Sequence, residues 1–82
     1  MIGASGQVGV PDGAGRRSGE VDEFDEAVGL GVVVDGGGAR YPFHCTQIAG
    51  GSRTIERGAH VSFAVIPGRA GRWEAGDIRV VG

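Results

Sequence analysis

The sequence predicts a small all-β domain, a five-stranded antiparallel barrel that follows a Gly-rich N-terminal tail. Glycine supplies 18 of the 82 residues, a composition typical of turns and short strands. From Gly19 onward, short apolar runs alternate with turn residues, and no stretch repeats apolar residues at helical spacing. Closure into a barrel is expected because it removes exposed strand edges.

Residues 1–18 are expected to be a disordered tail, because they carry too little apolar surface to offset the entropy of ordering. The domain is therefore expected to span residues 19–82. Its five strands are predicted at residues 21–25, 30–35, 40–45, 61–65 and 73–81.

Local patterns justify these strands in turn. The first ends at a turn around Glu26, and the second is rich in valine, which favours extended chain. The third leads into one helical turn near Ile48. The fourth shows the clearest alternation with a period of two residues, and a turn at 67–71 precedes the fifth. The residues whose alternation predicts a core are Val21, Val33, Tyr41, Phe43, Val61, Phe63, Val65, Ile78 and Val80.

The formal charge is −2, and every basic residue other than histidine is arginine. Phosphate neutralisation supplies most of the affinity of duplex-DNA binders, so the lack of a basic stripe disfavours tight duplex binding. Binding to a single strand remains open, because stacking of bases on side chains carries much of its energy.

Several classes of function lack the residues that they need. Cys45 is the single cysteine, which excludes an intramolecular disulfide, and one cysteine with two histidines is too few for a tetrahedral metal site. Because successive strand residues point to opposite faces, Cys45 is expected to diverge from His44, and Asp22 from Glu23. We therefore expect no enzyme activity and no cofactor.

No apolar run approaches the length of a membrane span, and the N-terminus lacks the pattern of a secretory signal. The expectation is a cytoplasmic protein without a membrane partner, and a free cysteine is compatible with that compartment.

Five motifs follow one another in a single register, at residues 19–25, 28–33, 40–48, 58–65 and 73–78. They resemble the segments G-x-V-K-W-F-N, K-G-F-G-F-I, D-V-F-V-H-F-S-A-I, G-x-x-V-x-F-x-V and P-Q-A-A-N-V of the cold-shock domain family. The resemblance implies a five-stranded antiparallel barrel of the OB type. It also implies binding of single-stranded RNA or DNA, with RNA the first expected target.

The family's binding surface is an aromatic platform flanked by lysines, and here most of its positions carry other residue types. The aromatic positions hold Glu23, Leu30, Val32, Pro42, Cys45 and Ser52, and the lysine positions hold Asp22 and Val28. Phe24 and His44 keep the family's residue types. Stacking contributes about 1–3 kcal/mol per base, and each 1.4 kcal/mol is about tenfold in affinity, so binding is expected to be weak.

The resemblance implies six candidate nucleic-acid-binding residues, Phe24, Leu30, Val32, His44, Arg53 and Trp73. The first four would form a reduced apolar platform, Arg53 would contact a phosphate, and Trp73 would stack at its side. Structural roles stand beside these functional ones. Phe24 could pack half-buried against the core, His44 could be a solvated surface residue, and Trp73 could pack against the rim of the barrel.

The alternative is a protein-interaction or self-associating module that has kept the barrel and lost nucleic-acid binding. Leu30, Val32, Pro42 and Cys45 would then form an aliphatic patch for a protein partner or a second copy. The acidic residues of the first strand and its turn are expected to be a solvated edge or a docking patch for a basic partner. Salt separates the two functions, because contacts between arginine and phosphate weaken with salt and an aliphatic interface does not.

Overall fold

A computed structural model describes residues 16–81, and within them five strands form one antiparallel sheet. The strands are β2 (Arg16–Asp25), β3 (Leu30–Asp35), β4 (Arg40–His44), β5 (His60–Pro67) and β6 (Trp73–Val80). Three short 3₁₀ helices lie between them, η1 (Cys45–Gln47), η2 (Ala49–Gly51) and η3 (Arg69–Gly71). These residues form no α-helix, which confirms the predicted all-β class.

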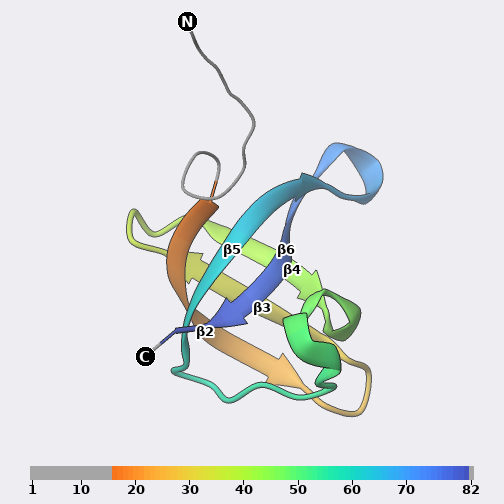
Figure 1. The fold of residues 1–82 in the computed structure, drawn as a ribbon. Coiled ribbons are helices and arrows are strands. Elements are labelled where there is room, and N and C mark those ends of the chain that lie inside the picture. The colour runs from red at the N-terminus through yellow and green to blue at the C-terminus, as the bar shows by residue number, and fades with distance from the viewer. Residues whose placement is uncertain (1–15, 82) are drawn as a thin grey trace, which may run out of the picture.

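The sheet curls strongly, with the strand order β4-β3-β2-β5-β6. β2 pairs with β5 along residues 16–20 and with β3 along residues 19–25, so it joins the two halves of the sheet. Figure 1 shows β5 and β6 crossing over β3 and β4, and the two edge strands β4 and β6 approach each other.

The predicted closure of the barrel is wrong, because in the described chain no hydrogen-bonded ladder joins β4 to β6. An isolated parallel bridge between Ile48 and Ile78 links this side of the sheet. Both edges carry features that oppose a ladder. Pro42 in β4 has no backbone N–H to donate, and β6 bends at a bulge around Asp77.

β2 begins at Arg16, three residues before the predicted start of the domain at Gly19. Arg16, Arg17 and Ser18 pair with residues 62–64 of β5. Residues 16–18 therefore belong to the sheet and not to the tail, whereas the rest of the predicted tail, residues 1–15, lies outside the described residues.

Side chains from all five strands fill the core. The buried apolar residues are Val21, Val33, Phe43, Ile48, Val61, Phe63, Ala75 and Ile78. Tyr41 and Val65, also predicted as core, are half-buried and pack against this cluster. Val80 is 60 % exposed, so its prediction as core is wrong. It pairs with Val61, but it is the last residue of β6, an edge strand with a ladder on one side only, so its side chain is open to solvent.

Candidate functional site

Four of the residues that the sequence singled out lie together on the outer side of β3 and β4. Leu30 pairs with His44, and Val32 pairs with Pro42. The intervening residues of these strands point into the core, so the four side chains share the opposite side of the sheet. Leu30 is 52 % exposed, His44 is exposed, and the other two are half-buried. We call this surface the β3–β4 face (Leu30, Val32, Pro42 and His44).

A depression of about 640 Å³ extends from this face toward the hairpin between β5 and β6. Its volume is within the range of about 300–1,000 Å³ that ligand sites usually have. The depression is lined by Leu30, Pro42, Phe43, His44, Pro67, Gly68 and Glu74. Sequence reasoning missed the last three. It recognised the turn that contains two of them, but the curl of the whole sheet decides where that turn lies.

The ring of His44 is oriented by the start of η1. The backbone N–H of Thr46 donates to His44 Nδ1 at 3.2 Å, and the Thr46 hydroxyl lies 2.9 Å from the same nitrogen. Since Nδ1 accepts the backbone hydrogen bond, the neutral imidazole carries its proton on Nε2. Nε2 is therefore a hydrogen-bond donor, and the His44 side chain is exposed.

The expected divergence of His44 and Cys45 is wrong. β4 ends at His44 and the chain turns into η1, so strand alternation does not apply, and Cys45 Sγ lies 3.9 Å from His44 Nδ1. That nitrogen already accepts from Thr46. The thiol packs against Gly29, where a Cβ atom would lie 2.9 Å from Sγ, and Cys45 also contacts the core cluster. Cys45 is therefore a packing residue at the edge of the β3–β4 face.

Phe24 lies apart from this face. Its ring stacks on the buried ring of Phe43, with the centroids 5.8 Å apart and the planes at 8°. Gly31, which pairs with Phe24, makes room for this stack, since a Cβ atom there would lie 2.6 Å from Phe43 Cζ. Phe24 thus has the half-buried packing role that the sequence left open.

Trp73 and Arg53 lie outside the depression. Trp73 begins β6 and is 59 % exposed, yet it is not among the described residues that line the depression, although the next residue, Glu74, is. Arg53 is exposed in the loop between η2 and β5. The structure thus groups Leu30, Val32 and His44, and it places Phe24, Arg53 and Trp73 elsewhere.

One arginine joins two acidic residues beside the face. Arg40 Nη1 donates to Asp22 Oδ2 at 2.9 Å, and Arg40 Nη2 donates to Glu23 Oε2 at 3.0 Å. The pairing of β2 with β3 shifts between Val21 and Glu23, which is a β-bulge. The expectation that Asp22 and Glu23 diverge is therefore wrong, because the bulge interrupts the alternation and both carboxylates reach one guanidinium.

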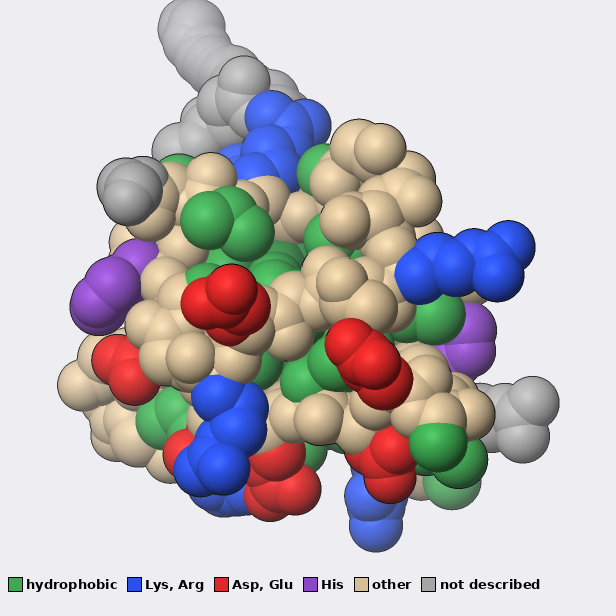
Figure 2. Space-filling model, turned by 90° about the horizontal axis from the view of Figure 1, so that it is seen from below, with side chains coloured by type: hydrophobic (Ala, Val, Ile, Leu, Met, Phe, Trp, Pro, Cys, Tyr) green, Lys and Arg blue, Asp and Glu red, His purple; other side chains and the backbone are tan. Residues whose placement is uncertain are grey.

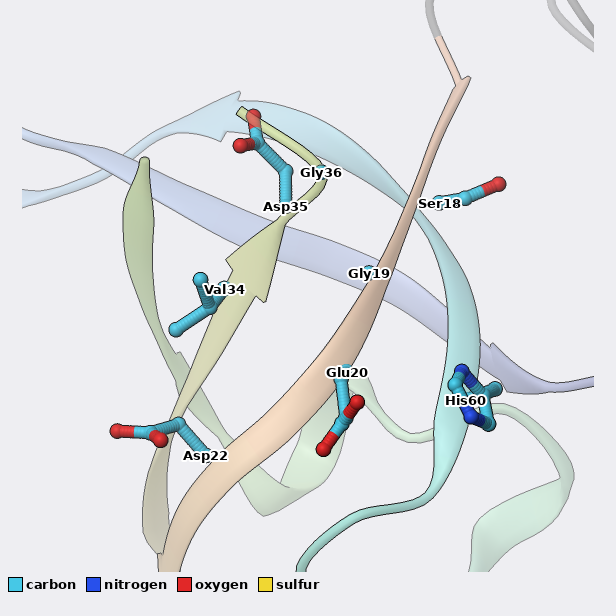
Figure 3. Close-up of a pocket in the computed structure, with 8 residues that line it drawn as sticks. All are labelled: Ser18, Gly19, Glu20, Asp22, Val34, Asp35, Gly36 and His60. Carbon is cyan, nitrogen blue, oxygen red and sulfur yellow. The ribbon is translucent and has the colours of Figure 1, made fainter. Parts of the chain in front are cut away.

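A second depression, of about 440 Å³, lies over β2 between β3 and β5, as Figure 3 shows. Glu20, Asp22 and His60 contribute its polar side chains from β2 and β5, together with Ser18 and Asp35. The carboxylates of this second depression repel a phosphate backbone, so the depression does not extend the β3–β4 face as a surface for nucleic acid. In Figure 2, acidic and arginine side chains are likewise interspersed around small apolar areas.

Asp77 is the centre of a charged cluster on β6. Arg79 Nη2 lies 3.1 Å and Arg16 Nη1 2.9 Å from Asp77 Oδ2. The hydrogen bond from Arg79 has the largest effect and lowers the pKa of Asp77 below its ordinary value. Desolvation opposes it, and the positive charges of Arg79 and Arg16 lower the pKa further. This cluster ties the strands together and is not part of the β3–β4 face.

Within residues 16–81, no group of three histidine, cysteine, aspartate or glutamate side chains is arranged to hold a metal ion. A helix of the length and apolar character needed to cross a bilayer is also absent from this part of the chain.

The fold of this chain is similar to that of a known structure. The structure of drosophila Unr CSD456 superposes with a TM-score of 0.63 and 28 % sequence identity. The fold is cold-shock-domain-like. The match covers 82 % of this chain and 27 % of the Unr CSD456 chain, so this chain spans about a quarter of the length of that chain. No protein-family model matches the sequence, and no curated protein does so.

Proposed function

We propose that this chain is a cold-shock-like module that binds single-stranded RNA or DNA weakly through the β3–β4 face. The observation that carries the proposal is the exposure of Leu30 beside Pro42 and His44, on the outer side of β3 and β4 in a cold-shock-domain-like fold. The sequence resemblance assigns the family's binding platform to these same two strands. The proposal gives the chain no catalytic role and no cofactor.

In this proposal, Leu30 and Val32 contact the faces of bases, and the His44 ring stacks on one base while Nε2–H donates to an acceptor on the strand. Arg53 contacts a phosphate at one end of the bound nucleic acid. Trp73 contacts the nucleic acid only where it extends beyond the hairpin between β5 and β6. Phe24 contributes indirectly, because its ring supports Phe43 beneath the depression.

Binding is weak for a physical reason. Aliphatic side chains stand at most of the aromatic positions, and each lost stack removes about 1–3 kcal/mol. The remaining contacts give an expected dissociation constant on the order of tens of micromolar at low salt. RNA and DNA share the contacts named above, and RNA is the first target to test.

The experiment is a fluorescence-anisotropy titration with a short, labelled, pyrimidine-rich single strand at low salt. Leu30→Asp should weaken binding by at least about tenfold, because it adds a charge that repels phosphate and removes an apolar contact. Val80→Asp is the matched control, since Val80 is an exposed strand residue, 60 % accessible, away from the face. Absence of binding by the unmodified chain, or an equal loss in both variants, would contradict the proposal.

The alternative function, a protein-interaction or self-association patch, also uses Leu30, Val32 and Pro42. Its fourth residue, Cys45, packs against Gly29 and the core, which reduces the apolar area that the patch can offer. Sedimentation at increasing concentration tests it. A dimer that Leu30→Asp disrupts and salt leaves intact would favour this alternative over nucleic-acid binding.

A further inference from the structure

Arg40 lies beside the β3–β4 face and has no part in the contacts proposed above. It begins β4, pairs with Val34 of β3, and is two residues from Pro42. Residues two apart in a strand project to the same side, so Arg40 shares the outer side of β4 with Pro42 and His44. Its side chain is 52 % exposed. A nucleic-acid strand bound on this face would therefore pass next to the guanidinium of Arg40.

Both terminal nitrogens of this guanidinium are occupied by carboxylates. Nη1 donates to Asp22 at 2.9 Å and Nη2 donates to Glu23 at 3.0 Å. The bulge in β2 makes this possible, because it brings two successive carboxylates to a single partner. A phosphate bound by arginine would use two such parallel N–H donors. The two carboxylates thus occupy one donor on each terminal nitrogen and place negative charge where a phosphate would bind.

We infer that Arg40 is a phosphate-binding residue of the β3–β4 face and that Asp22 and Glu23 mask it. The inference rests on the proposed function and names what limits affinity at that site. Asp22 and Glu23 have exposed fractions of 45 % and 63 %, and exposed pairs of this kind add little to stability, so a phosphate can displace them. A bound backbone nevertheless faces two carboxylates and one arginine, which leaves recognition to the bases.

The test is a double-mutant cycle in the full chain, measured by anisotropy with the short pyrimidine-rich single strand at several salt concentrations. Asp22→Asn with Glu23→Gln should raise affinity at least about tenfold, by freeing charged hydrogen bonds to phosphate. It should also steepen the slope of log affinity against log salt by about 0.7, the value for one added phosphate contact on a single strand.

Arg40→Gln distinguishes two causes of a gain in affinity, the release of Arg40 from its carboxylates and the change in net charge of the chain. It should remove most of the gain in the Asp22→Asn, Glu23→Gln background, and the loss of affinity that it causes there should be much larger than the loss in the unmodified chain. Glu26→Gln with Glu56→Gln is the matched control, because it changes the net charge equally at exposed residues that do not contact Arg40. This control should show a much smaller gain.

Two results would overturn the inference alone: equal gains in the two neutralised variants, or a gain that persists after Arg40→Gln. Absence of binding by the unmodified chain and by every variant would instead overturn the proposed function, and the inference with it. Far-UV circular dichroism verifies that each variant keeps its fold.

Discussion

Arg16 Nη1 lies 2.9 Å from Asp77 Oδ2, so the first described residue of β2 is tied to the bulge in β6. The same guanidinium donates to the Asp77 carbonyl at 2.8 Å and to the Ser62 hydroxyl at 2.9 Å. Asp77 has a φ of 46°, a left-handed conformation that residues other than glycine rarely adopt. Arg16 therefore joins β2, β5 and β6 at a strained point where the sheet bends.

Arg16→Ala should lower the free energy of unfolding by about 1–2 kcal/mol, because it removes three hydrogen bonds from a side chain that is 14 % exposed. Urea unfolding followed by far-UV circular dichroism measures this loss, with Arg53→Ala as an exposed control whose stability should change little.

A chain that begins at Gly19 should be less stable than one that begins at Arg16. Equal stability of these two chains would contradict the role of residues 16–18 in the sheet.

The charged cluster predicts a pH dependence. The pKa of Asp77 is held below its ordinary value of 3.8, first by the hydrogen bond from Arg79 and then by the charges of Arg79 and Arg16. A carboxyl whose pKa is depressed in the folded state stabilises the fold above its unfolded pKa, and that stability is lost as pH falls through the folded pKa. Asp77→Asn should therefore be less stable at neutral pH and approach the unmodified chain below about pH 4. Parallel stability curves from pH 7 to pH 2 would contradict this.

Gly31→Ala should destabilise the fold by about 1–3 kcal/mol, as overpacking of a core usually does. The added Cβ would lie 2.6 Å from the Glu23 carbonyl oxygen and 2.6 Å from Phe43 Cζ, so the stack of Phe24 on Phe43 would have to shift. Chemical denaturation measures the loss. Gly36→Ala is the control, because no atom lies within 4 Å of its added Cβ. A similar change in both variants would exclude close packing at Gly31.

His44 caps η1, and its proposed contact with bases is a separate role that substitution can isolate. His44→Ala should lose both, at a cost of about 0.5–2 kcal/mol in stability, the usual value of an N-cap. His44→Asn can accept the Thr46 N–H through its side-chain oxygen, so it should recover most of the stability without recovering binding. Denaturation and the anisotropy titration together test this. Full affinity in His44→Asn would show that the ring does not stack on a base.

Alternation along the strands accounts for the positions on β3 and β4 that the sequence predicted correctly. Alternation predicts Leu30, Val32 and His44 on one outer face and Val33 and Phe43 in the core beneath it, and the structure has this arrangement. These positions depend only on the period of two residues within a strand and on the antiparallel pairing of β3 with β4.

The errors occur where that period is interrupted. The bulge at Asp22 brings two neighbouring carboxylates to Arg40, and the end of β4 turns Cys45 back toward His44. At the start of β2, Arg16 and Arg17 looked like tail residues because the sequence around them is polar, yet their partners lie on β3, β4, β5 and β6. None of these partners is near them in the chain.

By itself, the sequence determined that this chain is built from short antiparallel strands, and which side of β3 and β4 faces water, because both follow from local patterns of apolar and turn residues. Only the tertiary structure decided where β2 begins and that no hydrogen-bonded ladder joins the edge strands β4 and β6 in the described residues. It also decided that Glu74 and Pro67 line a depression together with Leu30. These features depend on bulges and on the curl of the whole sheet, and that curl is set by pairing between residues far apart in sequence.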